Sequence, residues 1–254
     1  MGLFRSKKPA VTVGPVTTVK HTIAVINSST VMTDAEIAPI VQAMQVAISR
    51  DFAPIWGQDA ALVQIPQGGT PPTGAWWCVI LDDAPSGGYL GYHDLTPEDL
   101  PIMKIFAGTD KKYGNEVSVT LAHEIWEALG DPTINKCIQT PDGNFMAYEN
   151  ADACEDDSLA YLVNNVKISD FVFPSWFDAN AKGQVDFCNH LTKPFQLSPG
   201  GYIGIWTQQS GWTQLTAQAA DTKTLISSRG QVGSRRERRR TPRHQWVRST
   251  ATGS

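Results

Sequence analysis

The first elements of the chain are predicted by where its hydrophobic and polar residues fall. Residues 20–26 (KHTIAVI) alternate and are rich in β-branched residues, a pattern that predicts a strand. Thr33 then precedes Glu36 at the third helical position, which is typical of a capped helix start. Apolar residues recur at helical spacing from there to Ile48. We therefore expect a strand followed by an amphipathic helix that ends near Arg50.

Short apolar segments predict a series of further strands. They lie at residues 60–65, 75–81, 87–92, 102–107 and 161–168. A hairpin is expected later in the chain, with strands at 202–206 and 212–215 on either side of Ser210 and Gly211. Between these segments, residues 131–158 are expected to form a long acidic loop.

The stretch at 117–132, VSVTLAHEIWEALGDP, predicts a second helix because its apolar residues recur at helical spacing. Gly130 is expected to end it in a left-handed cap, and Pro132 to prevent a further turn. Strands precede and follow this central helix without regular βαβ alternation. The pattern therefore predicts an α+β fold with a mixed sheet.

Acidic and basic residues are divided unevenly along the chain, whose net charge is −4. Eight of its 21 basic residues and one of its 25 acidic residues lie from Arg229 onward, which leaves the end of the chain at about +7 and residues 1–228 at about −11. We predict an extended arm at 1–18, one folded domain at 19–228 and a disordered basic tail at 229–254. The tail would contact nucleic acid through phosphates or dock on an acidic partner.

Export and membrane insertion are not expected. The N-terminal sequence MGLFRSKKPAVTVGPV is broken by charged residues and prolines, unlike a signal peptide, and no segment approaches the roughly 18 apolar residues of a membrane helix. We therefore expect a soluble protein without a membrane partner. The four cysteines, which form no CxxC pair, are expected to be buried free thiols in preference to a Cys137–Cys154 disulfide.

The central helix carries the residues best suited to chemistry. His123 and Glu127 are four residues apart, so they share a helix face and could hold one metal ion. Glu124 occupies the position at which the HExxH motif of metalloproteases places its general base. Here the second histidine of that motif is replaced by Glu127. A carboxylate still binds zinc, but this harder site admits manganese, iron or calcium more readily. We expect a divalent metal, with zinc first among the candidates.

A third ligand is expected from the acidic segment that follows. Glu149 falls 22 residues after Glu127, which suits sites that a downstream glutamate completes. Asp152 is a close competitor, and Asp131, just past the helix, is a weaker choice. The competing interpretation is that His123 hydrogen-bonds locally and that both helix glutamates are solvated.

Two other histidines could contribute to chemistry. His93 could approach the metal site from a preceding strand or loop, but the favoured interpretation is a loop histidine bonded to Asp94. Cys188 and His190 could form a nucleophile pair, an interpretation that ranks well below the metal site.

Several segments together resemble an uncharacterised zincin-like family found in bacteria and their phages. They are GYHDLTPEDLPIMKIFAGTD, VTLAHEIWEALGDP, YENADACEDDS and ISDFVFPSWFD, with the opening IAVINSSTVMTDAEI and DFAPIWG, and PGGY near the end. The family's similar helix and following acidic stretch map here to His123, Glu124, Glu127, Asp131, Pro132, Glu149, Asp152 and Glu155. The resemblance covers roughly residues 20–218 and implies a zincin-type fold.

The motif and the resemblance lead to two hypotheses. The first is a metal-dependent peptidase that acts on a peptide or protein substrate, with His123, Glu127 and either Glu149 or Asp152 as metal ligands and Glu124 as base. The alternative is a structural protein of a phage virion, on the capsid surface or the tail, that uses the zincin-like fold as a non-catalytic module. Its arm and tail would order on further copies of the chain or on other virion proteins. The expected location is the bacterial cytoplasm or the virion.

Overall fold

The structure is a computed structural model that describes residues 19–85 and 90–217. The predicted arm at 1–18 and the predicted basic tail at 229–254 lie outside these residues. So do residues 218–228 of the predicted domain and residues 87–89 of one predicted strand.

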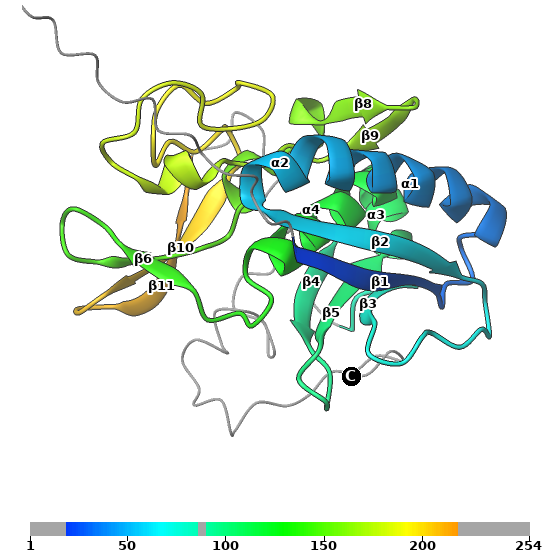
Figure 1. The fold of residues 1–254 in the computed structure, drawn as a ribbon. Helices are drawn as coiled ribbons and strands as arrows, with labels where there is room; N and C mark the ends of the chain where they lie inside the picture. Colours follow the sequence, from blue (N-terminus) through cyan, green and yellow to red (C-terminus); the bar gives the residue numbers. More distant parts are fainter. Residues whose placement is uncertain (1–18, 86–89, 218–254) are drawn as a thin grey trace, which may run out of the picture.

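A five-stranded mixed sheet forms the centre of the fold (Figure 1). Its strands lie in the order β2 (Gln58–Ile65), β1 (Val19–Asn27), β3 (Trp76–Leu81), β5 (Pro101–Phe106) and β4 (Gly91–Leu95). β1 is parallel to β2 and β3, and β3 is parallel to β5, whereas β4 at one end is antiparallel to β5. The mixed sheet and its helices confirm the predicted α+β class.

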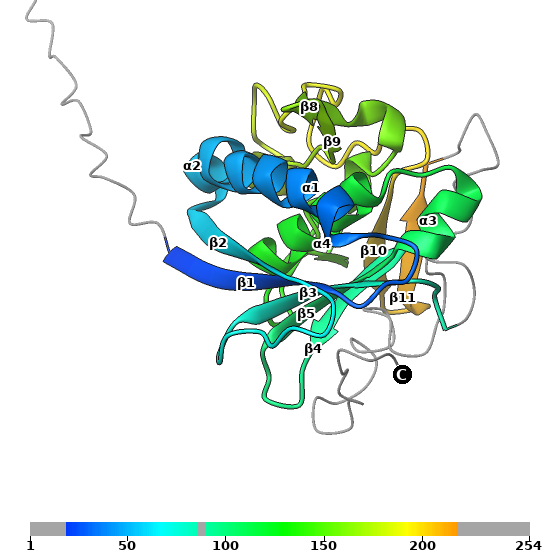
Figure 2. The same cartoon turned by 90° about the vertical axis from the view of Figure 1, so that its right-hand side faces the viewer.

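Two helices, α1 (Asp34–Ala47) and α4 (Val117–Gly130), cover one face of this sheet (Figures 1 and 2). Apolar residues of α1 and α4 pack in one core with residues of β1, β3 and β5. The predicted capping box of α1 is confirmed, since Glu36 N donates to Thr33 Oγ1 at 3.2 Å and Thr33 N donates to Glu36 Oε2 at 2.7 Å. The helical chain continues past the predicted end, through the π-helical turn η1 (Ile48–Phe52) into α2 (Ala53–Trp56).

The end of α4 differs from the prediction in the role of its glycine. Gly130 is the last helical residue and has no positive φ, so the predicted left-handed cap is wrong. A Cβ on Gly130 would lie 2.6 Å from Asn150 Nδ2. Asn150 in turn donates from Nδ2 to the carbonyl of Trp126 at 2.9 Å. Gly130 is therefore needed for close packing of Asn150 against the helix.

The region predicted as one acidic loop, 131–158, contains regular structure, so that prediction is wrong. Its elements are β6 (Cys137–Gln139), β7 (Phe145–Ala147) and two 3-10 turns, η2 (Asp152–Cys154) and η3 (Asp157–Leu159). The predicted final hairpin is confirmed as β10 (Tyr202–Thr207) and β11 (Gly211–Thr216). It joins the loop strands in a second sheet of order β11-β10-β7-β6. Strands of three residues are too short to show an alternating pattern in the sequence.

Three smaller differences complete the fold. The segment predicted as one strand, 161–168, is a hairpin of β8 (Tyr161–Val163) and β9 (Val166–Ile168), because Asn164 and Asn165 both adopt positive φ and turn the chain. The strand predicted at 87–92 is β4, which begins at Gly91 and continues to Leu95. Helix α3 (Ala107–Tyr113) was not predicted, and η4 (Pro174–Phe177) lies in the loop before β10.

Two general predictions were tested by the fold. All four cysteines are free thiols, as expected, but burial was predicted wrongly for Cys137, which is exposed, and for Cys188, which is half-buried. Within residues 19–85 and 90–217, none of the helices combines the length and the apolar character needed to cross a membrane.

Candidate metal centre

The candidate centre is built on α4, whose fourteen residues are all buried. Most of them are apolar and pack against the sheet or against the loops around it. The three ionisable residues of the helix, His123, Glu124 and Glu127, are therefore enclosed with it, at 9%, 5% and 4% exposure. Buried polar groups of this kind need partners. The interpretation in which both glutamates are solvated is wrong.

Two residues of α4 meet a carboxylate from a distant turn. His123 Nε2 lies 3.5 Å from Glu127 Oε1, one helical turn along, and 3.4 Å from Asp152 Oδ1 at the start of η2. One ligand atom from each of the three residues lies within 4.8 Å of the other two. Asp152 is 2% exposed. We call His123, Glu127 and Asp152 the helix cluster.

Further acidic groups surround Asp152. Glu149 is buried and its side chain interacts with that of Asp152. Burial raises the pKa of Asp152 well above its usual range, and the charges of Glu127 and Glu149 raise it further. Burial likewise raises the pKa of Glu155, with help from Glu127, against a hydrogen bond from Tyr202. Enclosed carboxylates at this density need protons or a cation to offset their mutual repulsion.

His93 also reaches the centre, which contradicts the favoured interpretation of a loop histidine bonded to Asp94. It lies on β4, is 2% exposed, and places Nδ1 3.4 Å from Glu124 Oε2 and 3.2 Å from Glu127 Oε2. His93, Glu124 and Glu127 form a second group whose ligand atoms lie within 4.8 Å of one another. Glu127 is thus common to both groups.

The approach of β4 to α4 depends on Gly91. A Cβ at Gly91 would lie 2.8 Å from Glu124 Oε1. Gly91 and His93 are two residues apart on one strand, so they face the same side of the sheet, toward α4. This spacing is the signal that could have placed His93 in the site. The strand predicted at 87–92 ends one residue before His93, so the prediction did not place Gly91 and His93 on the same face of one strand.

Of the three candidates for the third ligand, the structure brings Asp152 to His123, and the side chain of Glu149 interacts with that of Asp152. Asp131, the weaker choice, is buried, but its carboxylate accepts the backbone N–H groups of Asn135 at 3.2 Å and Lys136 at 2.9 Å. Asp131 therefore organises the loop after α4.

The donor set of the helix cluster fits a divalent cation. One imidazole and two carboxylates are ligands that zinc and manganese accept, and the extra oxygen donors also suit harder ions. Burial makes unbalanced negative charge costly, so a cation would stabilise the arrangement. Comparison of the chain with known protein families, curated proteins and solved structures finds no match.

Proposed function

We propose that this chain is a metal-dependent hydrolase of peptide bonds with a zincin-like fold. His123, Glu127 and Asp152 would hold the cation, and Glu124 would be the general base. The observation that carries the proposal is the meeting of the three donors of the helix cluster within 4.8 Å, with Glu124 on the same helix. Zinc is the first candidate, and manganese, iron or calcium are the alternatives that an oxygen-rich site allows.

The roles of the residues follow from their contacts. A bound cation would supply a Lewis acid that polarises the carbonyl group of the substrate. Glu149 would orient Asp152 through the interaction between their side chains. His93, with Nδ1 at 3.4 Å from Glu124 Oε2, would fix the direction of the carboxylate that takes a proton from the attacking water.

The position of β4 supports an extended peptide as the substrate. β4 lies at the end of the five-stranded sheet, next to α4, and in the described part of the chain its ladder partner is β5. An edge strand presents backbone N–H and C=O groups to which a peptide can add as a further strand. A peptide paired there would pass alongside Glu124, because Gly91 on β4 lies against that side chain.

The test is a Glu124→Gln variant beside the full-length wild type, both loaded with zinc or manganese and assayed on a quenched fluorescent peptide library. We expect the variant to retain metal and to lose about 10²- to 10⁴-fold in rate, the usual contribution of a general base. Glu98→Gln, which changes an exposed glutamate in the loop after β4, is the matched control and should be fully active. Equal cleavage by Glu124→Gln and wild type, or no cleavage by wild type, would reject the proposal.

A second candidate function is favoured by the enclosure of the centre. His93, Glu124, Glu127 and Asp152 are each at most 5% exposed, which also suits a metal that stabilises a structural module. The module would belong to a phage virion and assemble with copies of itself or with other virion proteins. Sedimentation of the full-length chain with purified phage particles, without peptidase activity, would support this candidate. A free monomer that does not sediment with particles would count against it.

A further inference from the structure

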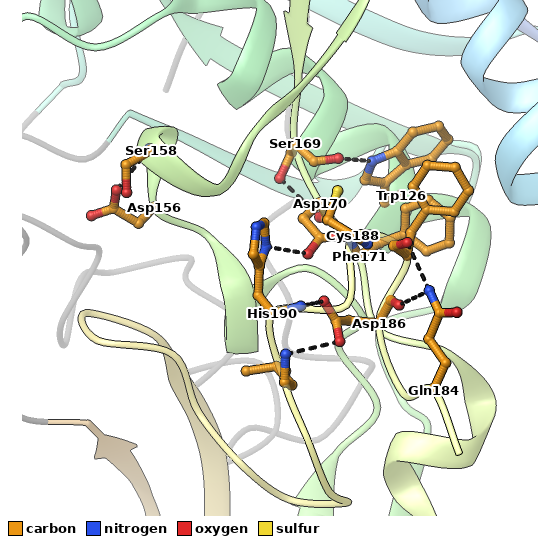
Figure 3. Close-up of polar contacts among 12 residues, drawn as sticks. Trp126, Asp156, Ser158, Ser169, Asp170, Phe171, Gln184, Asp186, Cys188 and His190 are labelled. Carbon is orange, nitrogen blue, oxygen red and sulfur yellow. Dashed lines mark hydrogen bonds and ion pairs between the residues drawn. The ribbon is translucent and has the colours of Figure 1, made fainter.

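A third group of candidate ligands lies outside the helix cluster, where the chain leaves β9 (Figure 3). Asp170 follows that strand, and Cys188 and His190 come from the long loop before β10. One ligand atom from each lies within 4.8 Å of the other two, and His190 Nδ1 is 3.2 Å from Asp170 Oδ2. We call these three residues the loop cluster. It contains one oxygen, one sulfur and one nitrogen donor.

The backbone holds these donors in place without regular secondary structure. Asp170 Oδ1 accepts the N–H groups of Phe171 at 2.7 Å and Cys188 at 3.1 Å. Between the two loop donors, Asn189 adopts φ 60°, a left-handed conformation that asparagine tolerates better than most residues. This turn lets Cys188 and His190 point toward the same carboxylate.

Asp186 supports the loop from behind. Its Oδ2 accepts the N–H of His190 at 2.7 Å and its Oδ1 accepts that of Leu191 at 3.0 Å (Figure 3). Asp186 and Asp170 are both 0% exposed, and their side chains interact with each other. Asp186 therefore acts as an outer support of the kind that orients metal ligands.

The three side chains of the loop cluster differ in their exposure to solvent. Asp170 is fully buried, Cys188 is half-buried, and the His190 side chain is 35% exposed. An ion can therefore reach the donors from the solvent side while the carboxylate lies in a dry environment. Burial raises the pKa of the Cys188 thiol, and the neighbouring carboxylate of Asp170 raises it further, so the thiolate that a nucleophilic cysteine would need is disfavoured. A metal cation reverses that preference, because thiolates coordinate metals strongly.

We propose that Asp170, Cys188 and His190 bind a transition metal ion, with zinc as the ion that best matches this donor set. The site leaves the fourth position of a tetrahedral ion to water on the solvent side, and its proposed role is to link segments of the chain. It ties the irregular segment 184–191 to the end of β9. It also abuts α4, since Trp126 Nε1 donates to the carbonyl of Ser169 at 3.0 Å, next to Asp170. Phe171 stacks on Phe187 with ring centroids 5.2 Å apart, so an apolar contact also holds the segment 184–191 against the chain that follows β9.

Cobalt(II) gives a readout specific for this site. Cobalt replaces zinc in many proteins and gives a near-ultraviolet charge-transfer band when a thiolate is among its ligands. The helix cluster contains only nitrogen and oxygen donors. Full-length protein titrated with cobalt should therefore show the band, which Cys188→Ser should remove and His190→Ala should weaken. Cys137→Ser, which removes an exposed thiol, is the matched control and should leave the band unchanged.

The same titration separates this proposal from the proposed function. Glu127→Ala should lose one equivalent of metal and keep the band, whereas Cys188→Ser should lose the other equivalent and keep peptidase activity. Absence of the band in the wild-type protein would overturn the proposal. This result needs no variant, so the proposal can be rejected even if a variant misfolds. A band that persists in Cys188→Ser would also overturn it, because the sulfur donor would then be another cysteine.

Discussion

The helix cluster and the loop cluster differ in how the chain builds them. In the helix cluster, two donors are placed by the repeat of α4, so their relation follows from a spacing of four residues. In the loop cluster, the donors are placed by hydrogen bonds that individual backbone N–H groups donate to the carboxylates of Asp170 and Asp186. A site on regular structure can be found from spacing, whereas a site held by loop hydrogen bonds is visible only in the folded chain.

The two clusters also differ in chemistry. The helix cluster offers one nitrogen and two oxygen donors, all nearly enclosed, and the loop cluster includes sulfur and opens to solvent at His190. Thiolate donors select softer ions, and carboxylates accept harder ones. If both bind metal, manganese should therefore load the helix cluster in preference to the loop cluster.

Trp126 lies between the two regions, and its removal should have the largest effect. Its ring stacks on Phe52 with centroids 4.6 Å apart, and its N–H bonds Ser169 beside the loop cluster. Trp126→Ala should lower the free energy of unfolding by about 3–5 kcal/mol, as for other buried aromatic residues. Urea denaturation of the variant and the wild type measures this difference in the free energy of unfolding.

Trp126→Phe is the informative control for that measurement. It keeps a ring in the core but leaves the Ser169 carbonyl without its donor, which should cost about 1–3 kcal/mol. If Trp126→Ala costs less than Trp126→Phe, the ring is not the link between the two clusters.

The identity of the third helix-cluster ligand is the next test. Asp152→Asn should lower metal affinity more than about 100-fold, because it changes a proposed ligand, whereas Glu149→Gln should cost about 10- to 100-fold, as outer-shell changes do. Isothermal titration with zinc measures both, and the cobalt band of the loop cluster should be unaffected by either. The reverse order of effects would make Glu149 the ligand.

The enclosed charge around α4 predicts a pH effect. Burial raises the pKa of Asp110 to about 8, against a hydrogen bond from Thr120, and the charges of Asp157 and Glu124 add to the rise. The folded state therefore holds a proton that the unfolded chain releases near pH 4, its ordinary value. The stabilisation is complete below about pH 4 and is lost as pH rises to about 8.

Asp110→Asn removes this titration while keeping the acceptor for Thr120 Oγ1, which donates to Asp110 Oδ1 at 2.8 Å. Relative to the variant, wild type should lose about 1.4 kcal/mol of unfolding free energy per pH unit between about pH 5 and pH 7. Chemical denaturation at several pH values measures the difference. Parallel profiles for the two proteins would show that Asp110 ionises normally.

The smallest effect is expected far from both clusters, at the start of α1. Thr33→Ala removes the side-chain acceptor for Glu36 N and should cost about 1 kcal/mol. Neither the metal content nor the cobalt band should change. A loss of metal in this variant would show that the clusters respond to general destabilisation, which would weaken the comparison between them.

The sequence predicted much of the sheet and its two main helices, because β-branched runs, a capping box and helical spacing are local signals. It also predicted His123, Glu124 and Glu127 as candidates, because their relation lies within a single helix. It could not choose between Glu149 and Asp152, because the turn η2 that brings Asp152 to His123 depends on contacts with distant segments.

Other errors have the same origin in contacts between segments distant in the sequence. His93 comes to Glu127 through pairing of β4 with β5 and packing of β4 on α4, and the local sign of that packing is Gly91, two residues earlier. Gly130 looked like a cap because glycine after a helical run usually is one, yet its reason is Asn150, twenty residues later. Cys188 and His190 were considered only as a pair, without Asp170.

Two closely packed glycines, Gly91 against α4 and Gly130 at its end, suggest how other chains of this architecture could be recognised. HExxE occurs often by chance, because glutamate is common on helices. A side chain at position 91 would collide with Glu124, and one at position 130 would collide with Asn150. Distant homologues that keep this packing should therefore carry a composite pattern, GxH on the edge strand followed by HExxExxG on the helix. That pattern reflects packing between the edge strand and the helix. It would distinguish chains with this fold from chains in which HExxE occurs by chance.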